Sequence, residues 1–171
     1  MHEAEGKLIL PFRKVIPDEK DKYKTCLPLF SLKAAAGGFG TAQEVKPDAW
    51  VEISTAKKLQ PGMFVAHVVG KSMEPTIPDG SWCLFKSPVE GSRSGRIVLV
   101  QNREIHDPET GGSFTVKRYK SMKQGDAAGT WRHVEIQLLP DNPEFQKIVL
   151  KANEDNEVAV IAEFIEVMKK F

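Results

Sequence analysis

A series of short apolar segments, each bounded by Gly, Pro or Asp, constrains the fold of this chain more than any other feature. The segments are rich in β-branched and aromatic residues, which favour strands over helices. They lie at residues 63–69, 81–85, 96–101, 113–119, 134–138 and 147–150. Before residue 155 no stretch of any length has helical periodicity. The pattern predicts a mostly β domain of short strands, arranged as a small sandwich or a barrel-like sheet.

Three segments are harder to assign from their pattern. Residues 26–32 are apolar but contain Pro28, which lacks the N–H of a ladder hydrogen bond and therefore predicts an edge strand. Residues 34–40 hold three glycines, which argue against a packed helix or strand and indicate either a linker or an extended peptide. Residues 158–168 fit a helix nearly as well as a strand.

The size and charge of the chain exclude several classes of protein. Its 171 residues suit one domain with an appended arm, and 24 basic against 23 acidic side chains leave a formal net charge of +1. So small a bias gives no overall argument for nucleic acid or a membrane surface as a partner. No apolar run approaches the roughly 18–20 residues that cross a bilayer, and residues 1–6 are polar, unlike a signal peptide. We therefore expect a cytoplasmic protein without a membrane anchor.

The two cysteines, Cys26 and Cys83, are too few to form a disulfide framework. Neither has a second cysteine at the spacing of a zinc site, so we expect two reduced thiols. No other pattern in the chain predicts a metal site or an organic cofactor, and we expect none.

The stretch at 69–80, V-G-K-S-M-E-P-T-I-P-D-G, has the pattern of a nucleophilic turn. A predicted strand ends at Gly70, so the hydroxyl of Ser72 follows a rigid element and can project into a cleft near backbone N–H groups. Acyl transfer needs both a nucleophile and donors for the oxyanion. Two prolines stiffen the loop that follows, and Met73 is an apolar neighbour that can keep water out.

Lys117 is the candidate for the base that removes the proton of Ser72. None of the four histidines has the sequence context of a catalytic triad. Lys117 lies at the centre of a predicted strand, where burial disfavours the charged amine and lowers its pKa. A neutral lysine can act as a general base, and Thr115 shares its face of the strand and could orient the amine. A lone turn serine is usually a cap and a lone strand lysine usually faces solvent, but the two motifs together favour catalysis.

Together, residues 70–80 and 115–118 resemble the motifs of the LexA/UmuD family of Ser-Lys peptidases. Phage repressors of the same type and the bacterial signal peptidases are more distant relations. The resemblance covers roughly residues 27–165 and implies a mostly β, LexA/signal-peptidase-like fold. It also implies site roles for four residues: nucleophile and general base for Ser72 and Lys117, and oxyanion or positioning roles for Met73 and Thr115.

The typical reaction of that family is cleavage of its own chain at an Ala-Gly or Cys-Gly bond that precedes the peptidase domain. This chain has Ala36-Gly37 in the expected place, 36 residues before Ser72. Small residues around the bond would let the segment enter a cleft in extended form, and the tether keeps the bond close to the nucleophile. The resemblance divides the chain into an arm at 1–26, a cleavage-site segment at 27–45 and a peptidase domain at 46–171.

The resemblance also implies a biological setting. Relatives act in the DNA-damage (SOS) response or in defence, they dimerise, and in regulated relatives a RecA–single-stranded-DNA filament favours cleavage. There is no room for a helix-turn-helix before residue 27, so the layout is closer to UmuD than to a LexA repressor. We expect a homodimer that forms through residues 158–168. We also expect a RecA-type filament, a helicase or a polymerase as partner, rather than direct contact with nucleic acid.

Two features depart from the family pattern. Lys71 precedes the serine, where an acidic or small residue is usual, and adds positive charge beside the site. The interval from Ser72 to Lys117 is 45 residues, which is somewhat long for the family. We place the extra length in a hairpin at 102–112, away from the chemistry.

Three other functions compete with self-cleavage. The fold could serve as a dimerisation or partner-binding module in which Ser72 and Lys117 no longer react. A signal peptidase acting in trans fits the Ser-Met-x-Pro motif but not the lack of a membrane span. Direct DNA binding would use the basic run at 117–123, although such a run is more often a solvated strand end.

Overall fold

The computed structural model describes residues 10–39, 45–125, 127–129, 131–151 and 158–168. Strands make up 42% of these residues and helix 5%, which confirms the prediction of a mostly β fold. No helix within the described residues has the length and apolar character needed to cross a membrane. The elements are β1 (Lys14–Val15), β2 (Cys26–Leu29), α1 (Leu32–Gly38), β3 (Ala49–Glu52), β4 (Met63–Val68), β5 (Ser81–Lys86), β6 (Ile97–Gln101), β7 (Phe114–Gly125), β8 (Trp131–Leu139), β9 (Ile148–Lys151) and β10 (Ala159–Val167).

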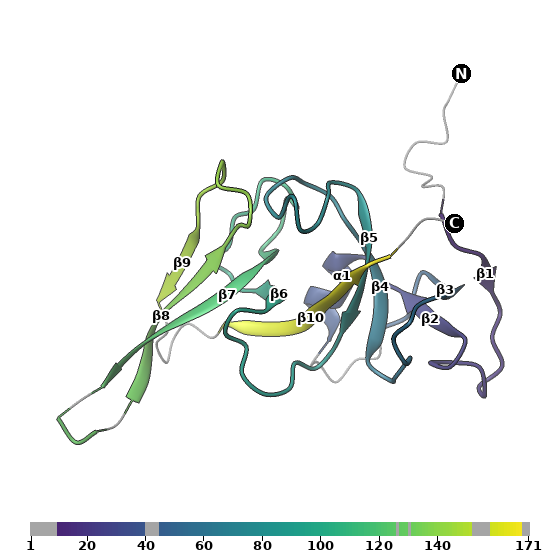
Figure 1. Ribbon diagram of the computed structural model, residues 1–171, viewed down its shortest axis with the longest axis horizontal. Coiled ribbons are helices and arrows are strands. Elements are labelled where there is room, and N and C mark those ends of the chain that lie inside the picture. The colour runs from purple at the N-terminus through teal and green to yellow at the C-terminus, as the bar shows by residue number, and fades with distance from the viewer. Residues whose placement is uncertain (1–9, 40–44, 126, 130, 152–157, 169–171) are drawn as a thin grey trace.

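The strands of the described residues form one sheet in the order β1-β3-β2-β4-β5-β10-β6-β7-β8-β9. Neighbouring strands are antiparallel, except for a short parallel contact between β2 and β4. Figure 1 shows that the sheet twists from β1 at one end of the molecule to the β7–β8 ribbon, which projects beyond the body at the other end. The C-terminal strand β10 lies between β5 and β6, so segments far apart in the sequence together form the body.

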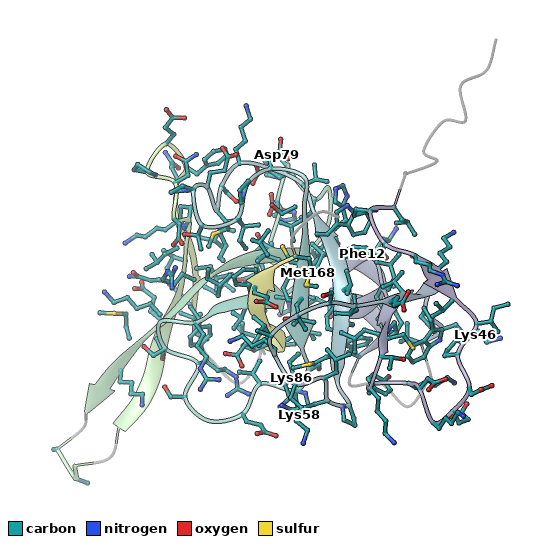
Figure 2. All side chains as sticks on the ribbon, turned by 45° about the vertical axis from the view of Figure 1, so that its right-hand side comes forward. Phe12, Lys46, Lys58, Asp79, Lys86 and Met168 are labelled. Carbon is teal, nitrogen blue, oxygen red and sulfur yellow. The ribbon has the colours of Figure 1, made fainter. Side chains whose placement is uncertain are left out.

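The central strands are apolar at successive positions because both of their faces are covered. In β4, Phe64 packs in one hydrophobic cluster, whereas its neighbours Met63 and Val65 pack in another. Successive side chains of a strand point to opposite faces, so a strand buried on both faces needs apolar residues throughout. Figure 2 shows Phe12 and Met168, two members of the second cluster, within the body of the molecule.

Residues 34–38 of the glycine-rich segment belong to a helix, so the prediction of a linker or an extended peptide is wrong there, while Gly40 lies outside the described residues. The helix α1 begins after the N-cap Ser31, whose hydroxyl accepts a hydrogen bond from the N–H of Ala34 at 3.0 Å. Ala35 and Ala36 are 0% and 1% exposed and belong to the same cluster as Phe64. Alanine side chains let a helix lie close to a sheet, and this packing outweighs the low helix propensity of the glycines at the end of α1.

The strand β2 is an interior strand, so the prediction of an edge strand at 26–32 is also wrong. It pairs with β3 on one side and with β4 on the other. The N–H of Phe30 donates to the carbonyl of Val65 at 3.0 Å. Backbone N–H groups two residues apart in a strand point to the same side, so the nitrogen of Pro28, like that of Phe30, faces β4. On that side β2 pairs with β4 at one residue pair only, Leu29 with Val65. The missing donor of Pro28 therefore removes no ladder hydrogen bond.

The ambiguous segment at 158–168 contains the strand β10. Its register shifts between Val160 and Ala162 along β6, and between Phe164 and Glu166 along β5. Each irregularity moves the side-chain alternation by one residue, which explains why the apolar pattern also fitted a helix. Both backbone edges of β10 are paired within the chain, so only its side-chain faces remain for the dimer contact predicted there.

Candidate active site

Ser72 lies in the turn that connects β4 to β5, and this turn is held by a contact within itself and by Asn142 from a distant segment. Gly70 has a φ of 119°, which L side chains rarely adopt. Its N–H donates to the Asp79 carboxylate at 2.7 Å. On the other side, the backbone N–H of Asn142 donates to the carbonyl of Ser72 at 3.0 Å, and its side-chain amide donates to the carbonyl of Lys71 at 3.0 Å. Ser72 therefore sits on a backbone that is fixed from both sides.

Lys117 lies in β7 with its amine against the hydroxyl of Ser72. The Nζ atom is 2.9 Å from Ser72 Oγ, 2.8 Å from Thr115 Oγ1 and 3.3 Å from the carbonyl of Val116. Three acceptors match the three N–H bonds of an ammonium group. Ser72 and Lys117 are only 6% and 4% exposed. The structure thus brings together three of the residues singled out from the sequence and shields them from water.

The environment of Lys117 contains opposing influences on its charge. Burial lowers the pKa of the Lys117 amine below its ordinary value, because the charged form loses its hydration. The carboxylates of Asp107 and Glu109 act in the other direction, and an oxygen of Asp107 lies 3.7 Å from Nζ. Burial is the larger effect, so the pKa is lowered overall. More of the amine is then neutral near pH 7, which is the form that can accept a proton.

Asp107 is a member of the site that the sequence did not reveal. One of its carboxylate oxygens accepts the hydroxyl of Thr115 at 2.5 Å, and the other accepts the N–H of Glu109 at 2.8 Å. Thr115 in turn accepts a hydrogen bond from Lys117. The prediction that residues 102–112 lie away from the chemistry is therefore wrong. The antiparallel pairing of β6 with β7 folds this connection back over the strand that carries the lysine.

The cleft at the pair of Ser72 and Lys117, called the dyad from here on, is nearly closed. Its free volume is about 20 Å³, which is enough for one water molecule but not for a peptide. Met73, predicted to keep water out, is 3% exposed and forms part of the wall. Leu32 of α1 and Glu109 form other parts of it. The chain therefore covers the hydroxyl of Ser72 in this conformation.

The structure does not bring the Ala36-Gly37 bond to Ser72. This bond lies within α1, about 6 Å along the helix axis from Leu32, which is the residue of α1 that reaches the cleft. The Ala36 side chain is buried against the sheet. An extended conformation of this bond would require α1 to unwind.

The basic run at 117–123 does not form a solvated strip. Lys117 is buried in the dyad, and Arg118 forms a 2.7 Å ion pair with Asp141. Lys120 and Lys123 remain exposed. The structural setting of this run thus gives little support to direct DNA binding through it.

Other candidate chemistry is sparse among the described residues. The thiols of Cys26 and Cys83 are buried and not bonded to each other. In the part of the chain that the structure describes, no group of three or more His, Cys, Asp or Glu side chains is arranged to hold a metal ion. The dyad is the site with the clearest chemistry.

Comparison with protein families agrees with the geometry. The sequence model of a family described as Peptidase S24-like matches residues 28–165, a span that includes both members of the dyad and α1. No curated protein matches the chain.

Proposed function

The chain belongs to the Peptidase S24-like family, and on that premise we propose that it is a Ser-Lys peptidase that cuts its own Ala36-Gly37 bond. Membership of the family indicates a serine peptidase of the LexA/UmuD type. One observation carries the finer proposal: the 2.9 Å hydrogen bond between the buried amine of Lys117 and the hydroxyl of Ser72. A serine hydroxyl needs such a base to become a nucleophile.

The proposed reaction begins with neutral Lys117. Its Nζ takes the hydroxyl proton of Ser72 while Oγ bonds to the carbonyl carbon of Ala36. Backbone N–H groups of the turn stabilise the oxyanion. The C–N bond to Gly37 then breaks, and the ammonium of Lys117 gives its proton to the leaving amine. Water attacks the resulting ester, with Lys117 taking and returning a proton, which releases the Ala36 carboxylate and restores the Ser72 hydroxyl.

The helix α1 controls the rate in this proposal. It has seven residues and ends in two glycines, so it would be unstable without its packing. Uncovering Leu32 alone costs about 2 kcal/mol. An engaged state with the segment extended is therefore a minor one, and the observed rate is the chemical rate multiplied by its population. Self-cleavage should be slow unless a partner favours the unwound state.

The direct test is incubation of the purified protein from about pH 7 to about pH 10, with intact mass measured over time. The expected result is two fragments that meet between Ala36 and Gly37, formed faster at higher pH because Lys117 must be neutral. The variant Ser72→Ala should stay whole. If the wild-type chain also stays whole throughout this range, self-cleavage at this bond is wrong.

A second function, a partner-binding module that does not cleave, is favoured by one observation. The cleft is closed to about 20 Å³ and the candidate bond lies in a packed helix. In that case the fold would serve a helicase or polymerase system through its surface. The double variant Ser72→Ala/Lys117→Ala would keep such a partner in a pull-down, and loss of the partner with the fold intact would count against the module.

The DNA-damage or defence setting belongs to the same proposal. A RecA-type filament would act by binding the state in which α1 is unwound, because a ligand shifts an equilibrium only through its preference for one state. Addition of such a filament should therefore accelerate cleavage of the wild-type chain.

A homodimer would use the side-chain faces of β10. The molar mass measured by light scattering at micromolar concentration tests this contact, and the mass of a monomer would show that the proposed dimer does not form.

A further inference from the structure

A carboxylate occupies the turn that carries the nucleophile. The backbone N–H of Lys71 donates to Oε2 of Glu109 at 2.6 Å. The same carboxylate lies so close to Gly70 that a Cβ at that glycine would be 2.5 Å from it. Glu109 also lines the small cleft that contains Ser72. The hydrogen bond and the close approach to Gly70 therefore place this acidic group at the backbone that immediately precedes Ser72.

The N–H of Lys71 is well placed for a catalytic task. In acyl transfer, the developing oxyanion is stabilised by N–H groups at or beside the nucleophile. The N–H of Lys71 is the donor immediately before Ser72 in the chain. A hydrogen bond of 2.6 Å to a carboxylate is short and charge-assisted. A peptide carbonyl cannot accept from Lys71 while Glu109 holds this donor.

We propose that Glu109 is a built-in inhibitor of the dyad, whose carboxylate takes the oxyanion position at the Lys71 N–H and leaves it before a peptide bond binds. The inference rests on the proposed peptidase function and names a regulator of the same site. The backbone of Glu109 is tied to Asp107 by a 2.8 Å hydrogen bond. Release is therefore a rotation of the partly exposed Glu109 side chain, while the connection between β6 and β7 keeps its place.

Glu109 has a second influence on the dyad, which can be separated from the first. The charged groups around the cleft are Lys117 on β7, Asp107 and Glu109 on the connection before it, and Lys71 and Asp79 on the turn. The Asp79 carboxylate accepts the N–H of Gly70, which lines the cleft, and the Lys71 side chain is exposed. Both carboxylates favour the ammonium form of Lys117. Removal of the Glu109 charge therefore increases the neutral fraction of Lys117 at a given pH, whatever happens at the N–H of Lys71.

Two substitutions distinguish these influences. Glu109→Gln removes the charge but leaves an amide oxygen that can still accept from Lys71, whereas Glu109→Ala removes both charge and acceptor. With Glu109→Gln, the rise of the self-cleavage rate with pH should move to lower pH, with little change at the alkaline plateau. With Glu109→Ala, the plateau itself should rise about 10- to 100-fold, because a donor to the oxyanion becomes free. The exposed Glu90, changed to Ala, is the matched control and should leave the profile unchanged.

A fluorophosphonate supplies a readout that does not depend on the chain's own scissile bond. Lys117 takes the hydroxyl proton of Ser72, the Ser72 oxygen bonds to phosphorus, and fluoride leaves. The adduct is measured by mass. At the alkaline plateau, where Lys117 is neutral in both proteins, Glu109→Ala should label faster than the wild type. If it labels and self-cleaves no faster, the inhibitor role is overturned, even where the wild type cleaves as proposed. If it labels faster but none of these proteins self-cleaves, the inhibitor role stands and the self-cleavage proposal fails. Thermal unfolding checks that each variant is folded. If Glu109→Ala is not folded, Glu109→Leu, which also lacks both the charge and the acceptor, takes its place, and labelling at the alkaline plateau no faster than the wild type then overturns the role.

Discussion

Ser72 and Lys117 are held by long strands and by side chains from several segments, whereas the bond that we propose they cut is held by a seven-residue helix. The dyad atoms are already 2.9 Å apart. The Ala36-Gly37 bond is buried, helical and outside the cleft. The comparison teaches that the chemistry is assembled in advance while access to it is not. Control of a reaction built in this way falls on α1 and on the groups that cover the cleft.

The difference between the two regions has a physical origin. The dyad is secured by the hydrogen-bond ladder of β6 with β7 and by the contacts of Asn142, so moving it would break many bonds at once. The helix α1 is secured by its Ser31 cap and by three buried side chains, namely Leu32, Ala35 and Ala36. Short helices depend on such packing and cap contacts rather than on intrinsic propensity. Local opening of α1 should therefore require much less free energy than opening of β7.

The largest expected effect is the loss of activity when the dyad is broken. Lys117→Met should reduce self-cleavage at least about 1000-fold, because no other base contacts the hydroxyl of Ser72 among the described residues. Lys120→Met, at an exposed lysine of the same strand, is the matched control and should cleave at the wild-type rate. Fragment formation measured by intact mass checks both. Equal loss in the two variants would show that the effect is not specific to the dyad.

The next effect is the dependence of the self-cleavage rate on pH, which reports the protonation of Lys117. Burial lowers the pKa of Lys117, and only the neutral amine accepts a proton. The cleavage rate should therefore rise about tenfold for each pH unit below that pKa and level off above it. The plateau should be reached below the pKa of about 10.4 that is usual for a lysine. Initial rates across the range test this, and a rate that falls as pH rises would contradict a lysine base.

A smaller effect is expected from loosening α1 without touching the dyad. Ser31→Ala removes the N-cap hydrogen bond to Ala34, which costs about 1 kcal/mol of helix stability. The engaged population, and with it the cleavage rate, should rise about fivefold. Ser31→Asp keeps a good capping group and should stay near the wild-type rate. If Ser31→Ala cleaves no faster than Ser31→Asp, unwinding of α1 does not limit the reaction.

The smallest expected effect is on the stability of the strand that carries Lys117, through the ion pair of Arg118 with Asp141. The Arg118 guanidinium holds the pKa of the Asp141 carboxyl below its usual range. The ion pair therefore adds stability above the usual aspartate pKa and loses it as pH falls through the lowered one. Arg118→Ala should lower the free energy of unfolding by about 1 kcal/mol at pH 7, with a smaller difference near pH 2. Urea denaturation at both pH values tests this, and an equal difference at both would exclude the ion pair as the cause.

The sequence predicted those parts of the molecule that depend on local pattern. The strands β4 to β9 followed from apolar runs, whereas β1 and β3 were not predicted. The turn motif and the strand lysine singled out Ser72, Lys117 and Thr115, which the structure brings together around the Lys117 amine. The helix α1 was missed because its glycines suggested an extended segment, whereas packing of alanines against the sheet decides its conformation. Its stability is a tertiary effect, which the local pattern of the sequence does not contain.

Polar residues that act at a distance were missed for a related reason. Asp107 and Glu109 belong to a segment rich in Pro, Gly and acidic residues, which reads as an ordinary solvent-exposed turn. Only the register of β6 with β7 brings Asp107 to Thr115, and only the position of the connection brings Glu109 to Lys71. Asn142 follows the C-terminal end of β8, and only the folded arrangement of the sheet brings it to the Ser72 turn.

Amide hydrogen exchange of the Ser72→Ala variant, which should not cleave, tests the contrast between the two regions most directly. Under the alkaline conditions of the cleavage assay, the amides of Ala35 and Phe39, which are bonded to carbonyls of Ser31 and Ala35, report the opening of α1. The amides of β7 report the opening of the strand that carries Lys117. We predict that the α1 amides exchange through a local opening of much lower free energy than that of β7. Equal protection of the two regions would contradict a preformed dyad whose access is set by α1.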